Sequence, residues 1–366
     1  MIKLPVGRGF LPNYNPLRKL PFGYEMLSDI ASNLPEYYTE GTIRKVVRDL
    51  PTLPVNHLSG PEQEAVMRDY AFIVSAYYHT PKYEENPSYI PSNLAVPFYQ
   101  ISQKFGKPPI LSYCSYCLNN WWCRFDNRGI DLGNIELIRK FTFTRDEKWF
   151  ILVHVDIEAN AQPLLGAMVH AIEAANIHDD LILEQNLILM GKIVDSLYKT
   201  LARMQEECHP EAYYKEVRIP IMQFKNIIFE GVKELGGNPI SLLGETGAQS
   251  SIIPSLVGAM EINHKQTGMM NFLAAHHQYM PPDHRRFIAE VKKSTIRQRV
   301  LQVKKTKLNE AYNFVLDRMY QFRAQHYEWA KLYIFSHVPD KTGTGGTPAD
   351  IWLAQLRDET AEHIIR

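Results

Sequence analysis

Cysteine is scarce in this sequence, and no long apolar run is present. Only 4 of the 366 residues are Cys, which excludes a small fold held together by disulfides. No apolar run approaches the roughly 20 residues that a membrane-spanning helix needs. Residues 1–5 lack the apolar core of a secretory signal. We therefore expect a cytoplasmic protein that does not act at a membrane.

Neither sign of charge is in excess. The chain has 40 Lys plus Arg and 40 Asp plus Glu, so it has no overall electrostatic attraction to nucleic acid. Hydrophobic residues make up 45% and charged residues 22% of the chain, which is enough apolar surface for a sizeable core. The length suggests one large or two modest domains.

Proline divides the first part of the chain into short segments. Residues 1–60 contain many proline and turn signals, which predict extended segments and short helices. A helical pattern begins at Gly60, with Pro61 in its first turn. A second proline-rich stretch predicts a loop over about 80–96.

Long helices are predicted beyond about residue 155. Apolar residues recur every three or four positions over 157–176 and 180–207. In the second segment one stripe contains Leu183, Leu187, Met190, Ile193, Val194, Leu197 and Leu201. Residues 149–158, which include His154, have by propensity alone the pattern of a buried strand leading into a helix. A lone histidine there is usually structural.

The segment 307–335 predicts another long helix, whose apolar stripe is interrupted by a histidine. The stripe consists of Leu308, Ala311, Val315, Met319, Phe322, Trp329 and Tyr333. His326 continues this spacing, and Arg323 precedes it by three residues, on an adjacent part of the same face. A hydrogen-bonded core histidine is one interpretation. An axial haem ligand is the other, with Arg323 placed for a haem propionate.

Several motifs give only weak signals for other chemistries. No H-E-x-x-H motif is present, so a zincin site is not indicated. Cys114, Cys117 and Cys123 lack a convincing fourth zinc ligand nearby and have apolar neighbours, which favours buried cysteines. The loop 343–347 lacks the flanking residues of a phosphate-binding loop and is better explained as a lid. The small residues of 244–251 allow a planar ligand to approach the backbone, or simply begin a helix.

Taken together, separated blocks of the sequence resemble the indoleamine 2,3-dioxygenase family over most of the chain and in the same order. The resemblance is carried by Gly9-Phe10-Leu11-Pro12, Lys19-Leu20-Pro21, Asn93-Leu94-Ala95-Val96-Pro97-Phe98, Pro108 to Tyr113, Asn120-Trp121, Gln249-Ser250-Ser251, Tyr279-Met280-Pro281-Pro282 with His284-Arg285, Arg323-Ala324-Gln325-His326, and Gly343-Thr344-Gly345-Gly346-Thr347.

The resemblance implies an all-α fold. A small, loop-rich helical domain over 1–140 would precede a large helical domain over 141–366 that holds haem b. It therefore implies a helix where propensity predicts a strand around 149–157. By the same resemblance His326 is the proximal iron ligand, while Arg323 and Ala248 contact the cofactor.

The resemblance also implies how a substrate is held. Arg218 would bind the substrate carboxylate, for which a guanidinium is suited by its paired hydrogen bonds. The side chains that would line or close the substrate pocket are Phe150, Tyr113, Tyr213 and Thr344. His154 stands where the mammalian enzymes have serine and would hold the indole nitrogen, assist proton transfer or hold bound oxygen. Tyr213 replaces a phenylalanine and adds a hydroxyl group.

The resulting functional expectation is a haem-dependent dioxygenase of tryptophan catabolism, in the kynurenine pathway. It would use O₂ to open the indole pyrrole ring of L-tryptophan, or of a close analogue, to an N-formylkynurenine-type product. An electron donor would keep the haem ferrous. Two alternatives stay open: a biosynthetic haem enzyme that inserts one oxygen atom into a modified tryptophan or rearranges it, and a haem-binding sensor or carrier without turnover.

Overall fold

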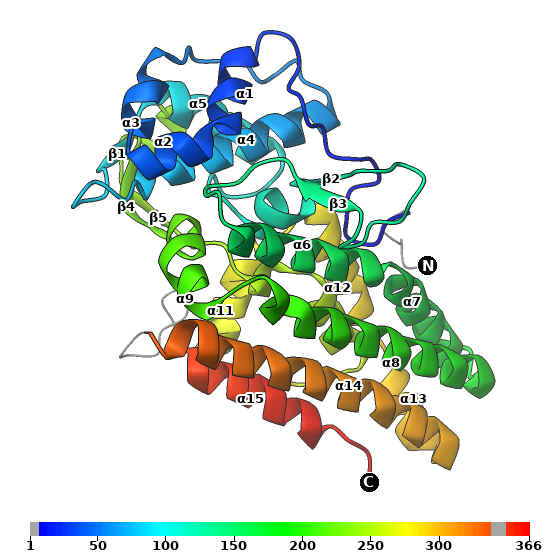
Figure 1. Cartoon of the computed structure of the whole chain (residues 1–366). Coiled ribbons are helices and arrows are strands. Elements are labelled where there is room, and N and C mark those ends of the chain that lie inside the picture. Colours follow the sequence, from blue (N-terminus) through cyan, green and yellow to red (C-terminus); the bar gives the residue numbers. More distant parts are fainter. Residues whose placement is uncertain (1–6, 338–348) are drawn as a thin grey trace.

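The structure is a computed structural model that describes residues 7–337 and 349–366. The all-α prediction is confirmed (Figure 1). The helices are α1 (Glu25–Ser32), α2 (Leu34–Glu40), α3 (Ile43–Val46), α4 (Gly60–Tyr78), α5 (Ser92–Lys104), α6 (Arg145–Asn160), α7 (Gln162–Asn176), α8 (Asp180–Ala202), α9 (Pro210–Ala212), α10 (Ile252–Ala259), α11 (Gly268–His277), α12 (Pro282–Val291), α13 (Ile296–Val303), α14 (Thr306–Ala330) and α15 (Ala349–Glu362).

The described residues contain five short strands. These are β1 (Tyr89–Ile90), β2 (Trp121–Cys123), β3 (Ile135–Leu137), β4 (Phe224–Phe229) and β5 (Ile240–Leu242). β4 pairs parallel to β1 and antiparallel to β5, and β2 pairs antiparallel to β3. The small β1-β4-β5 sheet therefore joins residues near 90 to residues near 230.

The first hundred residues gather around α4. This helix begins with a capping box, in which the Glu62 carboxylate accepts a hydrogen bond from the Ser59 backbone N–H at 2.8 Å. Pro61 occupies its first turn, as the sequence predicts. From Ala65 to Tyr78 every residue of α4 is buried, with α1, α2, α3 and α5 packed around it.

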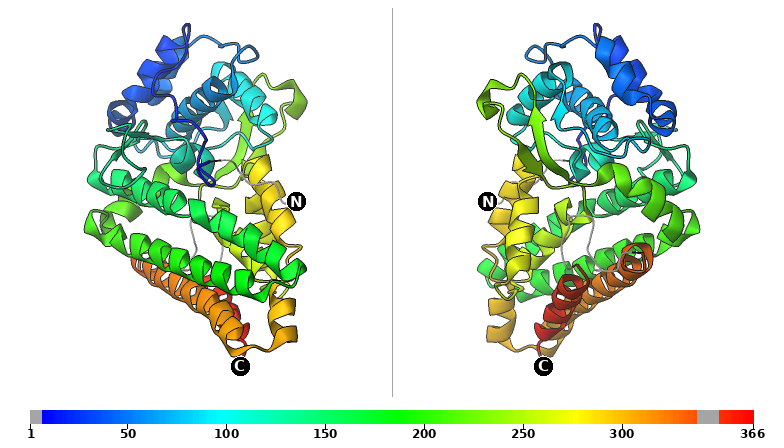
Figure 2. Two further views of the ribbon diagram at one scale, coloured as in Figure 1. Left: turned by 90° about the vertical axis from the view of Figure 1, so that its right-hand side faces the viewer. Right: turned by 90° about the vertical axis from the view of Figure 1, so that its left-hand side faces the viewer.

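The C-terminal part is a stack of long helices. α8 packs against α7 on one side and α14 on the other, and α15 lies along α14 (Figures 1 and 2). The predicted apolar stripe of α8, from Leu183 to Leu201, is buried. The close approach of α8 to α14 requires a glycine, because a Cβ at Gly191 would lie 2.2 Å from Cδ1 of Phe314. In the described chain, no helix has both the length and the apolar character needed to cross a membrane.

The strand predicted by propensity around 149–157 is wrong, because these residues lie within α6. Two clusters of buried apolar side chains meet on this helix. Ile151, Leu152 and Val155 belong to the cluster built mainly from the first 155 residues, whereas Val153 and Ile157 belong to the cluster of the C-terminal helices. A helix buried on both sides lacks a polar face, so its sequence has the continuous apolar pattern of a buried strand. The division predicted at residue 140 stays a prediction.

Several other predicted boundaries shift. The segment 157–176 is divided at Ala161 between the end of α6 and α7, which has Pro163 in its first turn. The helix predicted over 180–207 becomes α8 followed by the 3₁₀ turn η3 (Arg203–Glu206). The helix of 307–335 becomes α14 followed by the π-helical turn η8 (Lys331–Phe335). The loop predicted to reach 96 ends earlier, since α5 begins at Ser92. The lid predicted at 343–347 lies outside the described residues.

Candidate active site

Wide helical turns position three of the predicted site residues. The π-helical turn η2 (Cys114–Leu118) directly follows Tyr113. Tyr213 opens a second such turn, η4 (Tyr213–Val217), and Arg218 closes it by donating its backbone N–H to the Tyr213 carbonyl at 2.9 Å. Turns of this kind occur mainly as single turns and often at functional sites, because the extra residue displaces side chains from the regular helical spacing.

His154 and Phe150 lie one turn apart on α6. The Nδ1 atom of His154 is 2.7 Å from the Phe150 carbonyl oxygen. Because a carbonyl only accepts, Nδ1 carries the proton and Nε2 is left as an acceptor. Burial lowers the pKa of His154 below its usual value, so the imidazole is neutral at neutral pH. The site therefore contains a neutral histidine whose remaining nitrogen accepts a hydrogen bond.

The predicted aromatic residues converge on this part of α6. The Phe150 ring centroid lies 4.6 Å from that of His154 and 4.9 Å from that of Tyr213. Tyr113 meets His154 nearly edge-on, with centroids 5.9 Å apart. Tyr116, which no sequence motif singles out, lies 6.4 Å from Phe150. These rings form a largely apolar wall that suits a flat aromatic ligand.

His326 lies on α14, within electrostatic range of His154. The side chain of His326 is exposed by surface area, yet burial lowers its pKa to about 4. Together these observations describe a side chain that lines an internal space instead of the outer surface. After burial, the next largest contributions to the lowered pKa of His326 are the electrostatic interactions with His154 and then with Arg323. The two histidines therefore lie within electrostatic range of each other.

The surroundings of His326 fit a haem group. Its imidazole is neutral at neutral pH, as an iron ligand must be, and it has accessible space beside it. A second neutral histidine, His154, lies within electrostatic range of His326 and contacts the aromatic wall through Phe150. His326 would therefore hold the iron of such a group, and the bound group would supply the chemistry of O₂ activation.

Arg323 is buried and directed toward α15. Its guanidinium donates hydrogen bonds to the Leu356 carbonyl at 2.6 Å and to the Thr360 hydroxyl. It also lies 3.5 Å from Nε2 of His264, whose Nδ1 is 2.6 Å from the Glu359 carboxylate. Arg323 thus ties α14 to the last helix, and its pairing with a propionate stays a prediction.

The loop before α10 is fastened to the segment that contains Tyr113. The Gln249 side chain accepts the Tyr113 backbone N–H at 2.9 Å and donates to the Gly244 carbonyl at 2.9 Å. Ala248 precedes Gln249 within the 3₁₀ turn η7 (Gly247–Gln249) and is partly exposed. The small residues of this loop therefore lie beside the aromatic wall, where a planar group can approach the backbone.

Arg218 is buried, and its guanidinium carbon lies 5.3 Å from the centre of the Tyr214 ring. Its place at the end of η4 puts it one wide turn from Tyr213. The predicted substrate contact Thr344 lies outside the described residues. The roles of Arg218 and Thr344 toward a substrate stay predictions.

Sequence reasoning missed two buried carboxyl groups beside this site. Glu158 lies one turn beyond His154 on α6 and accepts hydrogen bonds from Tyr113 and Ser250. Glu245 lies in the loop before α10. Burial is the main cause of the raised pKa of Tyr113 and Tyr116, and Glu245 adds to the shift of both. The spacing of four residues between His154 and Glu158 becomes a signal only once this segment is known to be a helix.

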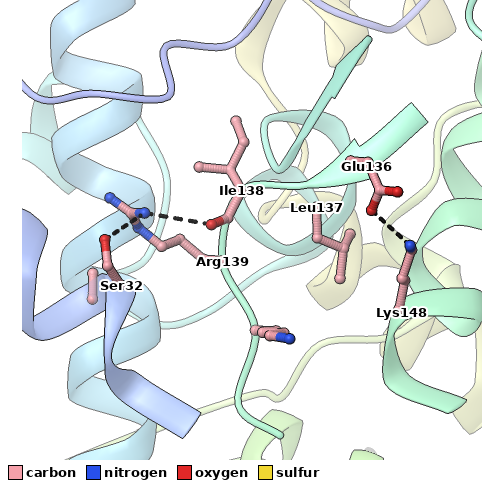
Figure 3. A pocket seen from close by; sticks show the side chains of 8 residues that line it. Ser32, Glu136, Leu137, Ile138, Arg139 and Lys148 are labelled. Carbon is pink, nitrogen blue, oxygen red and sulfur yellow. Dashed lines mark hydrogen bonds and ion pairs between the residues drawn. The ribbon is translucent and has the colours of Figure 1, made fainter. Parts of the chain in front are cut away.

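Other candidate sites in the described chain lack these features. A cavity of about 180 Å³ lies between α1, β3 and α6 (Figure 3). There Lys148 pairs with Glu136 at 2.6 Å and Arg139 pairs with buried Asp69 at 2.7 Å, so these charges are balanced internally. None of the predicted site residues lines this cavity. No cluster of three or more His, Cys, Asp or Glu within residues 7–337 and 349–366 is arranged to bind a metal ion.

Known proteins resemble this chain over nearly its whole length. The family model described as "Indoleamine 2,3-dioxygenase" matches residues 3–340. Indoleamine 2,3-dioxygenase 1 of Rattus norvegicus is 28% identical, over 96% of this chain and 92% of that protein. Indoleamine 2,3-dioxygenase 2 of Homo sapiens is 27% identical, over 95% and 91%. A myoglobin of Haliotis madaka is 25% identical, over 96% and 95%.

Proposed function

The chain belongs to the indoleamine 2,3-dioxygenase family, and on this basis we propose that it opens the indole pyrrole ring of L-tryptophan, or of a close analogue, to an N-formylkynurenine-type product. The family consists of haem-dependent dioxygenases that use O₂, and the proposed cofactor here is haem b. The observation that carries the proposal is the pair of neutral histidines, His154 and His326, within electrostatic range of each other, with His154 in contact with the aromatic wall.

In this proposal each of the site residues has a separate role in binding. His326 holds the iron, and the bound haem supplies the activation of O₂. Phe150 and Tyr213 contact the indole ring and keep water away from it. Arg218 binds the substrate carboxylate through charge-assisted hydrogen bonds. The Nε2 atom of His154 accepts the indole N–H, because Nδ1 already donates to the Phe150 carbonyl. The indole is thereby oriented before any bond changes.

A haem carrier without turnover is the second candidate, and the similarity to the myoglobin of Haliotis madaka favours it. A carrier needs His326 and a protected pocket but has no need of a residue that binds a carboxylate. The buried guanidinium of Arg218, next to the aromatic wall, therefore supports an amino-acid substrate. An enzyme that inserts a single oxygen atom would use the same residues and is separated from the dioxygenase by its product.

The deciding experiment is mass spectrometry of an aerobic reaction between L-tryptophan and the reduced, haem-loaded protein. A product that gains two oxygen atoms and fragments as N-formylkynurenine supports the proposal, and a gain of one oxygen atom contradicts it in favour of the single-oxygen alternative. Stable O₂ binding without any product supports the carrier.

A His326→Ala variant tests the iron ligand in the same preparation. We expect haem content to fall to a small fraction of the unaltered protein, because the cofactor loses its bond to the chain. A matched control is His170→Ala, since His170 is an exposed histidine of α7. Full haem content and activity in the His326 variant would refute the assignment.

A further inference from the structure

Glu158 is a buried carboxyl group that the proposed chemistry does not use. It lies on α6 four residues after His154, and only 1% of its surface is exposed. One oxygen, Oε1, accepts the Tyr113 hydroxyl at 3.0 Å and the Ser250 hydroxyl at 2.7 Å. The other oxygen, Oε2, is buried and has no hydrogen-bond partner among the described residues. A buried carboxyl oxygen without a hydrogen-bond partner destabilises the folded state, so such a group in a native site points to a functional role.

The two hydrogen bonds to Glu158 join three separate parts of the site. Tyr113 comes from the turn before η2, Ser250 from the loop that contains Ala248, and Glu158 from the helix of His154. The Tyr113 ring in turn lies nearly edge-on to the His154 ring. Glu158 is therefore connected to the His154 ring through Tyr113 and to the 244–251 loop through Ser250.

The surroundings of Glu158 make its charge sensitive to pH near neutrality. Burial raises its pKa to about 7, while the hydrogen bonds from Ser250 and Tyr113 act in the opposite direction. No cation of the described chain forms an ion pair with it. The titratable groups that face this part of the site are Tyr113, Cys117 and Glu245, and the pKa of each is raised. His154 titrates on the acid side, because burial lowers its pKa.

Protonation changes what Glu158 does for its two partners. The ionised carboxylate accepts both hydroxyl groups in charge-assisted hydrogen bonds, which are stronger than neutral ones. The neutral acid accepts them more weakly, because its oxygen carries less negative charge. The ionised form thus fixes Tyr113 and the 244–251 loop, and the protonated form loosens them.

We propose that Glu158 is a positioning residue whose ionisation tightens the wall of the substrate pocket, so that substrate affinity rises with pH through neutrality. This inference rests on the proposed binding of an indole amino acid. Glu158 accepts hydrogen bonds from Tyr113 and Ser250. Tyr113 contacts the ring of His154, and Ser250 belongs to the loop of Ala248.

The test measures the dissociation constant of L-tryptophan from the shift it causes in the haem spectrum, between pH 5.5 and 8.5. We expect the affinity of the unaltered protein to rise about tenfold, with a midpoint near neutrality. A tenfold rise corresponds to a pKa of Glu158 that is about one unit lower with substrate bound than without it. Glu158→Gln keeps an oxygen that accepts both hydroxyls but cannot ionise, so its affinity should not change across this range. Glu173→Gln, an exposed glutamate on α7, is the matched control and should behave like the unaltered protein.

Two further variants keep the inference testable if Glu158→Gln does not load haem. Ser250→Ala and Tyr113→Phe each remove one hydrogen bond that favours the ionised form, so each should move the midpoint to higher pH. An unmoved midpoint in both variants would overturn the inference. Glu245→Gln is measured in parallel. A transition that disappears in this variant and persists in Glu158→Gln would also overturn it.

The outcomes separate this inference from the function on which it rests. A haem spectrum that does not respond to L-tryptophan at any pH contradicts the proposed substrate class. A clear response with the same affinity at every pH leaves that substrate class in place and overturns the role of Glu158.

Discussion

Replacing Glu245 by glutamine should remove a pH-dependent loss of stability from this protein. Glu245 is 3% exposed, and its backbone N–H bonds to the Ile221 carbonyl at 2.9 Å, which fixes the start of the loop. No described residue donates a hydrogen bond to its carboxyl group or forms an ion pair with it. Burial alone raises its pKa from 4.5 to about 8.

The direction of the effect follows from proton binding. Between pH 4.5 and about 8 the folded chain keeps the proton on Glu245, whereas the unfolded chain has released it. Raising the pH over this range therefore favours unfolding, by about 1.4 kcal/mol per pH unit for one such group. Raising the pH over the whole range lowers the free energy of unfolding by roughly 5 kcal/mol through this group. The part of that loss between pH 5.5 and 7.5 is roughly 3 kcal/mol. Glutamine does not titrate, so the variant lacks this contribution.

The assay is urea unfolding followed by circular dichroism at pH 5.5 and 7.5, for protein with equal haem content. The free energy of unfolding of the variant relative to that of the unaltered protein should increase by roughly 3 kcal/mol between the two pH values. Other buried acids, such as Glu147 and Glu158, are present in both proteins and cancel in the comparison. Glu234→Gln, at an exposed glutamate, should show no such increase. Equal pH dependence in the Glu245 variant and the unaltered protein would refute the reasoning.

Three further predictions concern the site and the helix stack. Arg218→Leu should raise the KM for L-tryptophan at least tenfold with unchanged haem content, measured by steady-state kinetics, and an unaltered KM would count against carboxylate binding. His154→Phe removes the acceptor for the indole N–H, so KM should rise more for tryptophan than for its N-methylated analogue; equal effects would contradict that hydrogen bond. Gly191→Ala should destabilise the protein by about 1–3 kcal/mol, because its Cβ would overlap the Phe314 ring, and an unchanged melting temperature would show that the ring moves away freely.

The sequence determined the helical elements whose signals are local. The stripe from Leu183 to Leu201 predicted α8, and Pro61 in a first turn predicted the start of α4, because helix periodicity and proline geometry act within a few residues. The break in the apolar stripe of α14 is equally local, and it singled out His326. The predicted placement of Phe150, Tyr113 and Tyr213 came from resemblance to a family, not from these local rules.

Only the tertiary structure decided what depends on packing. Residues 149–157 form a helix although their propensity favours a strand, because α6 is buried between two apolar clusters and needs no polar face. The contacts of Arg323 with Leu356 and Thr360 join residues more than thirty positions apart, which no local pattern encodes. The same holds for Glu158, whose partners Tyr113 and Ser250 come from distant segments. Its ionisation is set by burial and by those partners, and both exist only once the chain has folded.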